Sequence, residues 1–186
     1  MIKDLLEEIK HCRKCLLRNT ARVVVVGSGN PDANILIVGE APGVEEDKQG
    51  IPFVGRSGQL FRESISSILD LENDVFITNV VMCRPPNNRI TNEHIEYCSG
   101  NFWKLVRSMQ PDKIITLGRT SFESIILEKI EGGILEATGI VRKIQLNKKI
   151  VNVFPMVHPA WVIRNREENM VEWLVEIEGL KNFLQN

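Results

Sequence analysis

The sequence has no apolar run long enough to cross a lipid bilayer, no internal repeat and no low-complexity segment. Its first residues, MIKDLLEEIK, have the pattern of a charged amphipathic helix and not that of a signal peptide. We therefore expect a cytoplasmic protein and no membrane partner. The 186 residues are enough to bury a core, so we expect a single domain over residues 1–186, acting as a monomer.

The chain also lacks an excess of charge of either sign. Its 23 basic side chains are balanced by 24 acidic ones, and the net charge is −1. This balance does not indicate a nucleic-acid-binding protein, but it does not exclude one. An enzyme that scans DNA needs only a local basic face.

Cysteine is scarce, with four residues in the chain, and in a reducing cytosol disulfides are the weaker interpretation of them. Cys12 and Cys15 have the C-x-x-C spacing that lets two thiolates reach one metal centre. Cys83 and Cys98 are far away in the sequence, so only the fold could bring all four together. On spacing alone, zinc is favoured over an iron–sulfur cluster, because sites with four cysteine ligands bind zinc more often.

Apolar runs alternate with helical patterns along the chain. The runs predict four buried strands, at residues 35–38, 75–81, 113–118 and 151–157. Amphipathic patterns predict four longer helices, at residues 57–69, 92–109, 121–130 and 167–184. This alternation predicts an α/β domain in which helices cover both faces of a mostly parallel sheet.

Weaker local signals complete the expected secondary structure. Ser57 and Asn92 are expected N-caps, and Thr120 with Glu123 is an expected capping box. Three further segments are expected to form a short helix, an edge strand or extended arm, and a hairpin, at residues 2–10, 23–26 and 138–150.

Unusual residues follow the predicted strands at their carboxyl ends. Glu40 lies in the tight turn after the first strand, and Phe53 lies in a Gly/Pro loop beyond it. Asn79 is near the end of the second strand, and His158 follows the fourth. Ligands of parallel α/β sheets bind beyond the carboxyl ends of the strands, so we expect these residues to converge on one site.

Four segments resemble the iron–sulfur uracil-DNA glycosylases, often called family four: GEAPGVEEDKQGIPFVG, TNVVMCRPP, LGRTS and VHPAWVIR. The cysteine pattern C-x2-C, a long gap, then C-x14-C fits this family as well. The resemblance implies a three-layer α/β/α sandwich around a four-stranded, mostly parallel sheet. It also implies a [4Fe–4S] cluster and hydrolysis of the N-glycosidic bond of uracil in double- or single-stranded DNA.

The resemblance assigns roles to individual residues. Phe53 would stack on the base, Asn79 would read its edge, and His158 would be the main catalytic residue. The residues expected to bind uracil are Gly39, Glu40, Ala41, Phe53, Asn79 and His158. The expected cluster ligands are Cys12, Cys15, Cys83 and Cys98.

The chemistry of uracil excision suits these residue types. The Asn79 amide can donate a hydrogen bond to uracil O4 and accept one from N3–H, whereas cytosine can form neither of these two bonds. A neutral His158 could donate one N–H to O2 of the leaving uracil anion. Glu40 and Glu46 are both candidates to stabilise the sugar cation or to position water, and the sequence does not choose between them.

DNA contacts are expected around the pocket, from exposed backbone N–H groups of two loops and from nearby arginines. The expected residues are Pro42, Gly43, Arg84, Arg89, Pro159, Ala160 and Arg164. The Lys and Arg pairs between residues 142 and 149 are more often an exposed hairpin than a DNA footprint.

Several alternatives stay open. Phe53 could be a core anchor of its loop, and His158 could be a structural turn histidine. The chain could be a glycosylase-like module that binds DNA without turnover, because Ala41 replaces a water-orienting aspartate of the best-known glycosylases and Ala160 replaces a serine of many relatives. It could also be a zinc-stabilised nucleic-acid protein.

Overall fold

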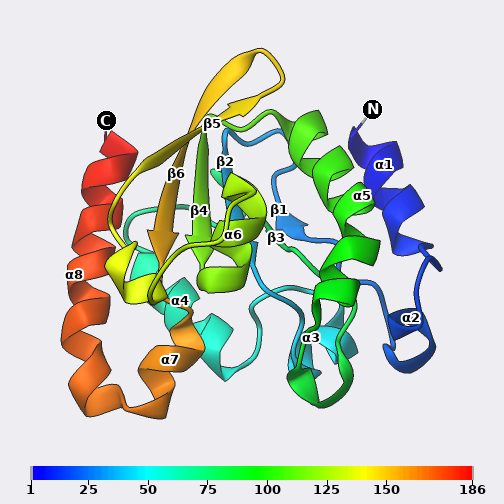
Figure 1. Cartoon of the computed structure of the whole chain (residues 1–186), viewed down its shortest axis with the longest axis horizontal. Helices are drawn as coiled ribbons and strands as arrows, with labels where there is room; N and C mark the ends of the chain where they lie inside the picture. Colours follow the sequence, from blue (N-terminus) through cyan, green and yellow to red (C-terminus); the bar gives the residue numbers. More distant parts are fainter. Residues whose placement is uncertain (1, 186) are drawn as a thin grey trace.

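The computed structural model, which describes residues 2–185, contains a six-stranded sheet with strand order β1-β3-β2-β4-β6-β5 (Figure 1). The strands are β1 (Ser28–Gly29), β2 (Ile35–Gly39), β3 (Val75–Asn79), β4 (Lys113–Leu117), β5 (Arg142–Leu146) and β6 (Lys149–Met156). The four central strands are parallel, and β1 and β5 pair antiparallel at the edges. The predicted α/β class and its four buried strands are confirmed.

The expected number of strands was too small, because short edge strands extend the sheet on both sides. β1 has two residues, too few to produce a period in the sequence. β5 and β6 form the hairpin expected at residues 138–150, which is confirmed. Residues 23–26 form an extended arm and not a strand, with Val25 N donating to Met82 O at 2.8 Å.

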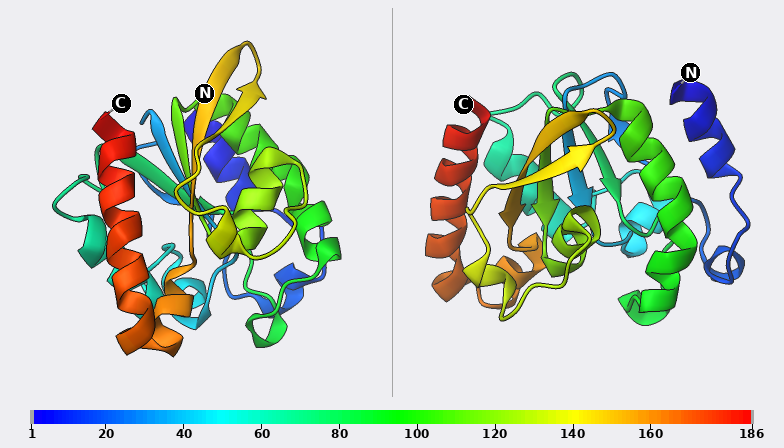
Figure 2. Two further views of the ribbon diagram at one scale, coloured as in Figure 1. Left: turned by 60° about the vertical axis from the view of Figure 1, so that its left-hand side comes forward. Right: turned by 45° about the horizontal axis from the view of Figure 1, so that its top comes forward.

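Helices cover both faces of the sheet, which gives the three-layer arrangement visible in Figure 2. One face carries α1 (Ile2–Lys10), α2 (Leu17–Thr20), α5 (Asn92–Met109) and α6 (Arg119–Ile126). The other face carries α4 (Arg56–Ile65), α7 (Pro159–Arg164) and α8 (Arg166–Gln185). The short elements are α3 (Val44–Gln49), η1 (Pro86–Asn88) and η2 (Ile134–Glu136).

Alternation along the strands divides the apolar side chains between two cores. On β2, Leu36 and Val38 point to the core under α5, and Ile37 points to the core under α8. Both faces of the central strands are therefore buried, which is why these strands read as continuous apolar runs. No helix within residues 2–185 combines the length and apolar content that a bilayer span requires.

Two predicted helix starts were wrong by a residue or two. Helix α4 begins after Gly55 and not at Ser57. Helix α5 is capped by Thr91 and not by Asn92: the Thr91 hydroxyl accepts from His94 N, and His94 Nδ1 accepts from Thr91 N. Neighbouring polar residues can all cap a helix, so the sequence alone does not choose the one whose backbone is extended.

The predicted capping box of α6 was also wrong, because both of its side chains have other partners. The Glu123 carboxylate accepts from Arg119 and from Lys129, each at 2.7 Å. The Thr120 hydroxyl donates to a carboxylate beyond β2, as described below. The helix starts instead after Gly118, whose φ of +93° favours glycine.

The first turn of α4 packs directly on the backbone of the Phe53 loop. A Cβ added at Gly58 would lie 2.2 Å from the carbonyl carbon of Phe53 and 2.3 Å from its oxygen. Only glycine allows this approach, so Gly58 fixes how closely α4 supports the loop.

We predict that Gly58→Ala destabilises the protein by about 1–3 kcal/mol, because the new methyl group overlaps with backbone atoms that cannot move aside. Gly100→Ala in α5 is the matched control, because no atom lies within 4 Å of the added Cβ, and it should stabilise the protein by about 0.5–1 kcal/mol. Urea unfolding of both variants measures the two changes. Equal effects of the two substitutions would contradict the contact at Gly58.

Candidate active site

A pocket of about 230 Å³ opens beyond the carboxyl ends of the parallel strands. Figure 1 shows the strand arrowheads pointing toward the end of the molecule where α3 and α7 lie. The pocket is lined by Glu40, Ala41, Pro42, Gly43, Glu46, Phe53, Ser57, Asn79, Pro85, Asn88, His158 and Ala160. The predicted convergence of Glu40, Phe53, Asn79 and His158 is therefore confirmed.

Gly39 allows the ring of Phe53 and the amide of Asn79 to meet. Gly39 and Asn79 are register partners at the ends of β2 and β3. A Cβ at Gly39 would lie 2.4 Å from Asn79 Oδ1 and 2.4 Å from Phe53 Cζ. Any other residue at position 39 would displace one of these two groups.

Phe53 is both a core residue and part of the pocket lining. Its side chain is 6% exposed, and its ring centroid lies 5.8 Å from that of Phe61 in the core under α8. Its φ of +57° is strained for a bulky residue and has to be held in place by its surroundings. Arg62 does so by donating to Phe53 O and Pro52 O, both at 2.9 Å.

His158 is the N-cap of α7, and its ring nitrogens have distinct roles. Nδ1 lies 3.1 Å from Ala160 N. A backbone N–H can only donate, so Nδ1 must be the acceptor and the proton of the neutral ring is on Nε2. The ring centroid of His158 is 6.5 Å from that of Phe53, which places the imidazole beside the aromatic surface.

The charge state of His158 is controlled by burial. Burial lowers the pKa of His158 below its ordinary value; the carboxylates of Glu40 and Glu46 raise it, and Arg164 lowers it further. The net direction is downward, so the imidazole is neutral at pH 7. The ring is thus suited to donate one hydrogen bond, not to act as a cation.

The two candidate carboxylates have different environments. Both oxygens of Glu46 accept from backbone amides, Oε1 from Gly55 N at 2.7 Å and Oε2 from Gly43 N at 3.1 Å. Glu46 thereby ties the start of α3 to the start of α4. Glu40 accepts one bond through Oε2, from Thr120 Oγ1 at 2.7 Å.

The expectation of exposed backbone donors in two loops was wrong. Gly43 N donates to Glu46, and Ala160 N donates to His158. Pro42 and Pro159 have no N–H to offer. These loops can shape the pocket rim, but the two amides have partners inside the protein.

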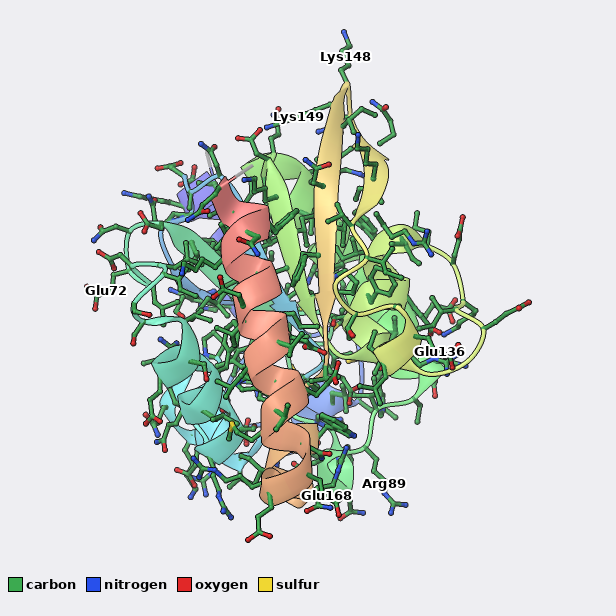
Figure 3. All side chains as sticks on the ribbon, turned by 90° about the vertical axis from the view of Figure 1, so that its left-hand side faces the viewer. Glu72, Arg89, Glu136, Lys148, Lys149 and Glu168 are labelled. Carbon is green, nitrogen blue, oxygen red and sulfur yellow. The ribbon has the colours of Figure 1, made fainter. Side chains whose placement is uncertain are left out.

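The three expected arginines differ in exposure. Arg84 is half-buried, and its Nε donates to Asn88 Oδ1 at 2.9 Å, which steadies the loop after β3. Arg89 and Arg164 are exposed. Figure 3 shows Arg89 reaching into solvent at one end of the molecule and Lys148 and Lys149 at the opposite end, so the hairpin lysines lie away from the arginine.

The four cysteines are brought into one neighbourhood by α1, the loop after β3, and α5. Burial raises the pKa of Cys83 to about 12, and the nearby Cys98, Cys15 and Cys12 add to this rise. Burial likewise raises the pKa of Cys98 to about 11. All four thiols are free. Across residues 2–185, no three Cys, His, Asp or Glu side chains are arranged to hold a single metal ion.

Comparisons with known proteins agree with this geometry. A family model described as the uracil DNA glycosylase superfamily matches residues 26–178. The chain is 42% identical over 168 residues to the type-4 uracil-DNA glycosylase of Sulfurisphaera tokodaii, covering 88% of this chain and 76% of that protein. It is 36% identical over 187 residues to the type-4 enzyme of Thermotoga maritima, covering 96% and 92%. For the type-4 enzyme of Archaeoglobus fulgidus, identity is 41% over 165 residues, covering 87% and 83%.

The chain belongs to the type-4 uracil-DNA glycosylase family. The resemblance drawn from the sequence motifs is thereby confirmed.

Several residues that build the site of this type-4 glycosylase family member were not expected from the sequence. Thr120 was assigned to a helix cap, although its hydroxyl binds Glu40 across 80 positions of the chain. Arg62 carried no signal in the sequence, although it holds the Phe53 loop. Ser57 was expected only as a helix cap, Pro85 was noted only within a motif, and Asn88 was not expected, but all three line the pocket.

We predict that the imidazole of His158 is still neutral at pH 6.5, its ordinary pKa, and takes up a proton only at lower pH. The unfolded chain gains that proton first, so the free energy of unfolding falls as the pH drops from about 6.5 toward the folded-state pKa. NMR titration of the ring nitrogens measures the folded value, and the urea-unfolded protein supplies the reference. Protonation of the folded-state ring above pH 6.5 would contradict the prediction.

Proposed function

We propose that the protein is a monofunctional glycosylase that hydrolyses the N-glycosidic bond of a flipped-out uracil in DNA. The products would be free uracil and an abasic site. The observation that carries the proposal is the meeting of an aromatic ring, an amide and a neutral imidazole in one pocket, at the ends of parallel strands.

Base binding would rest on Phe53 and Asn79. A base that leaves the duplex loses stacking, and a stack on Phe53 would return about 1–3 kcal/mol. The buried Asn79 amide, 2% exposed, would donate to uracil O4 and accept from N3–H. Cytosine presents a donor at position four and an acceptor at N3, so it would leave the amide unpaired in a buried site, and a polar pocket rejects such a base strongly.

His158 would stabilise the leaving group. As the glycosidic bond breaks, its electron pair goes to uracil, and negative charge spreads to O2. The Nε2–H of a neutral imidazole can donate to that oxygen, as a donor of an oxyanion hole does. The bond from Ala160 N to Nδ1 supports this role, because it keeps the proton on the other nitrogen.

Glu40 is the better candidate to position the water that attacks the sugar. Both oxygens of Glu46 are occupied by backbone amides, so Glu46 is better suited to hold the loop. Glu40 lines the pocket next to Ala41, and within residues 2–185 its carboxylate accepts a hydrogen bond from Thr120 through Oε2 and binds no backbone amide. Its negative charge would also favour the positive charge that develops on the sugar.

We further propose that Cys12, Cys15, Cys83 and Cys98 hold a [4Fe–4S] cluster. Burial and the three other thiols raise the pKa of Cys83, and this proximity of the four thiols, together with the spacing of the cysteines along the chain, supports the proposal. The cluster would be a structural cross-link. It would join the segment after α1 to α5 and to the loop after β3, whose residues Pro85 and Asn88 line the pocket.

Uracil-containing DNA is the proposed partner, with Arg89 and Arg164 as exposed phosphate contacts. A monomer is proposed because one chain supplies every residue of the pocket. A single domain is proposed because both helical layers share one sheet. The free cysteines support a reducing compartment such as the cytoplasm.

We predict that the protein releases free uracil from a labelled oligonucleotide, and that His158→Ala lowers the single-turnover rate about 10²–10³-fold. DNA affinity should change little, because the lost bond forms mainly in the transition state. His11→Ala, an exposed position in the segment after α1, is the matched control. Tight binding by the wild type without any uracil release would support the non-catalytic binding module instead.

We predict that protein purified without oxygen is brown, with broad visible absorption, and that Cys98→Ala loses this colour and melts at a lower temperature. Ser99→Ala, the next residue of α5, should keep both properties. Iron and zinc analysis of the same sample decides between the two metals, and one zinc per chain would overturn the cluster proposal.

A further inference from the structure

A buried carboxyl lies behind the active site and has no part in the chemistry proposed above. Glu176, in the middle of α8, is 4% exposed, in the core that contains Trp173 and Leu180. Its Oε2 accepts from Val157 N at 2.9 Å. Its Oε1 has no hydrogen-bond partner within the described part of the chain.

Burial of the Glu176 carboxyl costs folding free energy. Burial raises its pKa to about 7, the amide of Val157 and the neighbouring Thr138 counter this rise, and Glu172 of the same helix adds to it. The Thr138 hydroxyl lies near the carboxyl but donates to Leu135 O at 3.1 Å, so it leaves Oε1 unpaired. A leucine at this position would avoid the cost of the unpaired oxygen, but it would leave the buried Val157 amide without its acceptor.

The bond from Glu176 is made at the first peptide of the short connection from β6 to His158. β6 ends at Met156, and α7 begins at Pro159, which has no N–H. The amide of Val157 is one residue before His158, and its hydrogen bond leads from this connection back to the core. A carboxylate on α8 fixes the direction of that peptide from the core side.

Two further contacts restrain His158 from other directions. Ala160 N donates to its Nδ1 from the first turn of α7. Gly118 packs against it, since an added Cβ there would lie 3.1 Å from His158 Cβ. With the bond to Val157 N, the ring is held from its own helix, from the start of α6 and from α8.

We propose that Glu176 is a positioning residue for His158, fixing the end of β6 so that the Nε2–H of the imidazole faces the pocket. This inference rests on the proposed glycosylase function for its rate measurement. It assigns to α8, which contributes no residue to the pocket lining, a part in aligning the reacting group.

The test compares Glu176→Leu, Glu176→Gln and Leu180→Val in the full chain. Glu176→Leu should lower the single-turnover rate of uracil release about 10–100-fold, because small misplacements of a catalytic group have effects of this size. Its affinity for the oligonucleotide should stay within about twofold. Its melting temperature should stay close to that of the wild type, because the loss of an unpaired buried carboxyl oxygen offsets the buried Val157 amide that is left without its acceptor.

Glu176→Gln keeps an acceptor for Val157 N, so it should recover most of the rate lost in Glu176→Leu. Leu180→Val loosens the same helix without touching that bond, so it should lower the melting temperature and leave the rate nearly unchanged. An unchanged rate in Glu176→Leu overturns the proposal. A loss of rate that parallels a loss of stability, without recovery in Glu176→Gln, shows a purely structural role and also overturns it.

A second measurement separates this inference from the proposed function. NMR of the His158 ring nitrogens should show the Nε2–H tautomer in the wild type and a mixture of tautomers in Glu176→Leu, or in Glu176→Met if the leucine variant does not fold. This readout needs no turnover. If the wild type releases no uracil, the glycosylase proposal fails, and an unchanged tautomer in the variant still decides against Glu176.

Discussion

The close approach at Gly39 is the constraint on which the site depends. Because this residue has no side chain, the Phe53 ring and the Asn79 amide reach the same point beyond two adjacent parallel strands. The rest of the fold keeps the pocket at this position open and holds its lining in place. Two packed cores hold the strands in register, and the loops beyond them supply Glu40 and His158. The pocket is thus a consequence of strand order, with its chemistry added by loops.

Three charged side chains act on the backbone of the active-site loops. Glu46 binds two amides, Arg62 binds two carbonyls around the strained Phe53, and Glu176 binds the amide before His158. Each places a charged group where it is partly or fully removed from water. Such groups are costly in a core, and their common effect is to fix loop geometry. The proposed cluster would act in the same way on the loop after β3.

Much of the fold was predictable because each central strand is buried on both faces and each main helix has one apolar face. The order of these patterns leaves few topologies, since parallel strands need helical crossovers. The predictions that failed concern short or local features: the edge strand β1, the caps of α4 and α5, and the capping box at Thr120. These depend on which of several suitable partners a side chain finds, and short segments have too few residues for a period.

The sequence by itself determined the family, the α/β class and the residue types gathered at the strand ends, because apolar periodicity and specific motifs are properties of the chain order. It did not determine which nitrogen of His158 carries the proton, which of Glu40 and Glu46 binds backbone amides, or that Glu176 binds the amide of Val157, one residue before the histidine. Those outcomes were decided by the tertiary structure alone. They depend on hydrogen bonds and burial between residues far apart in the chain, and such contacts leave no local pattern to detect.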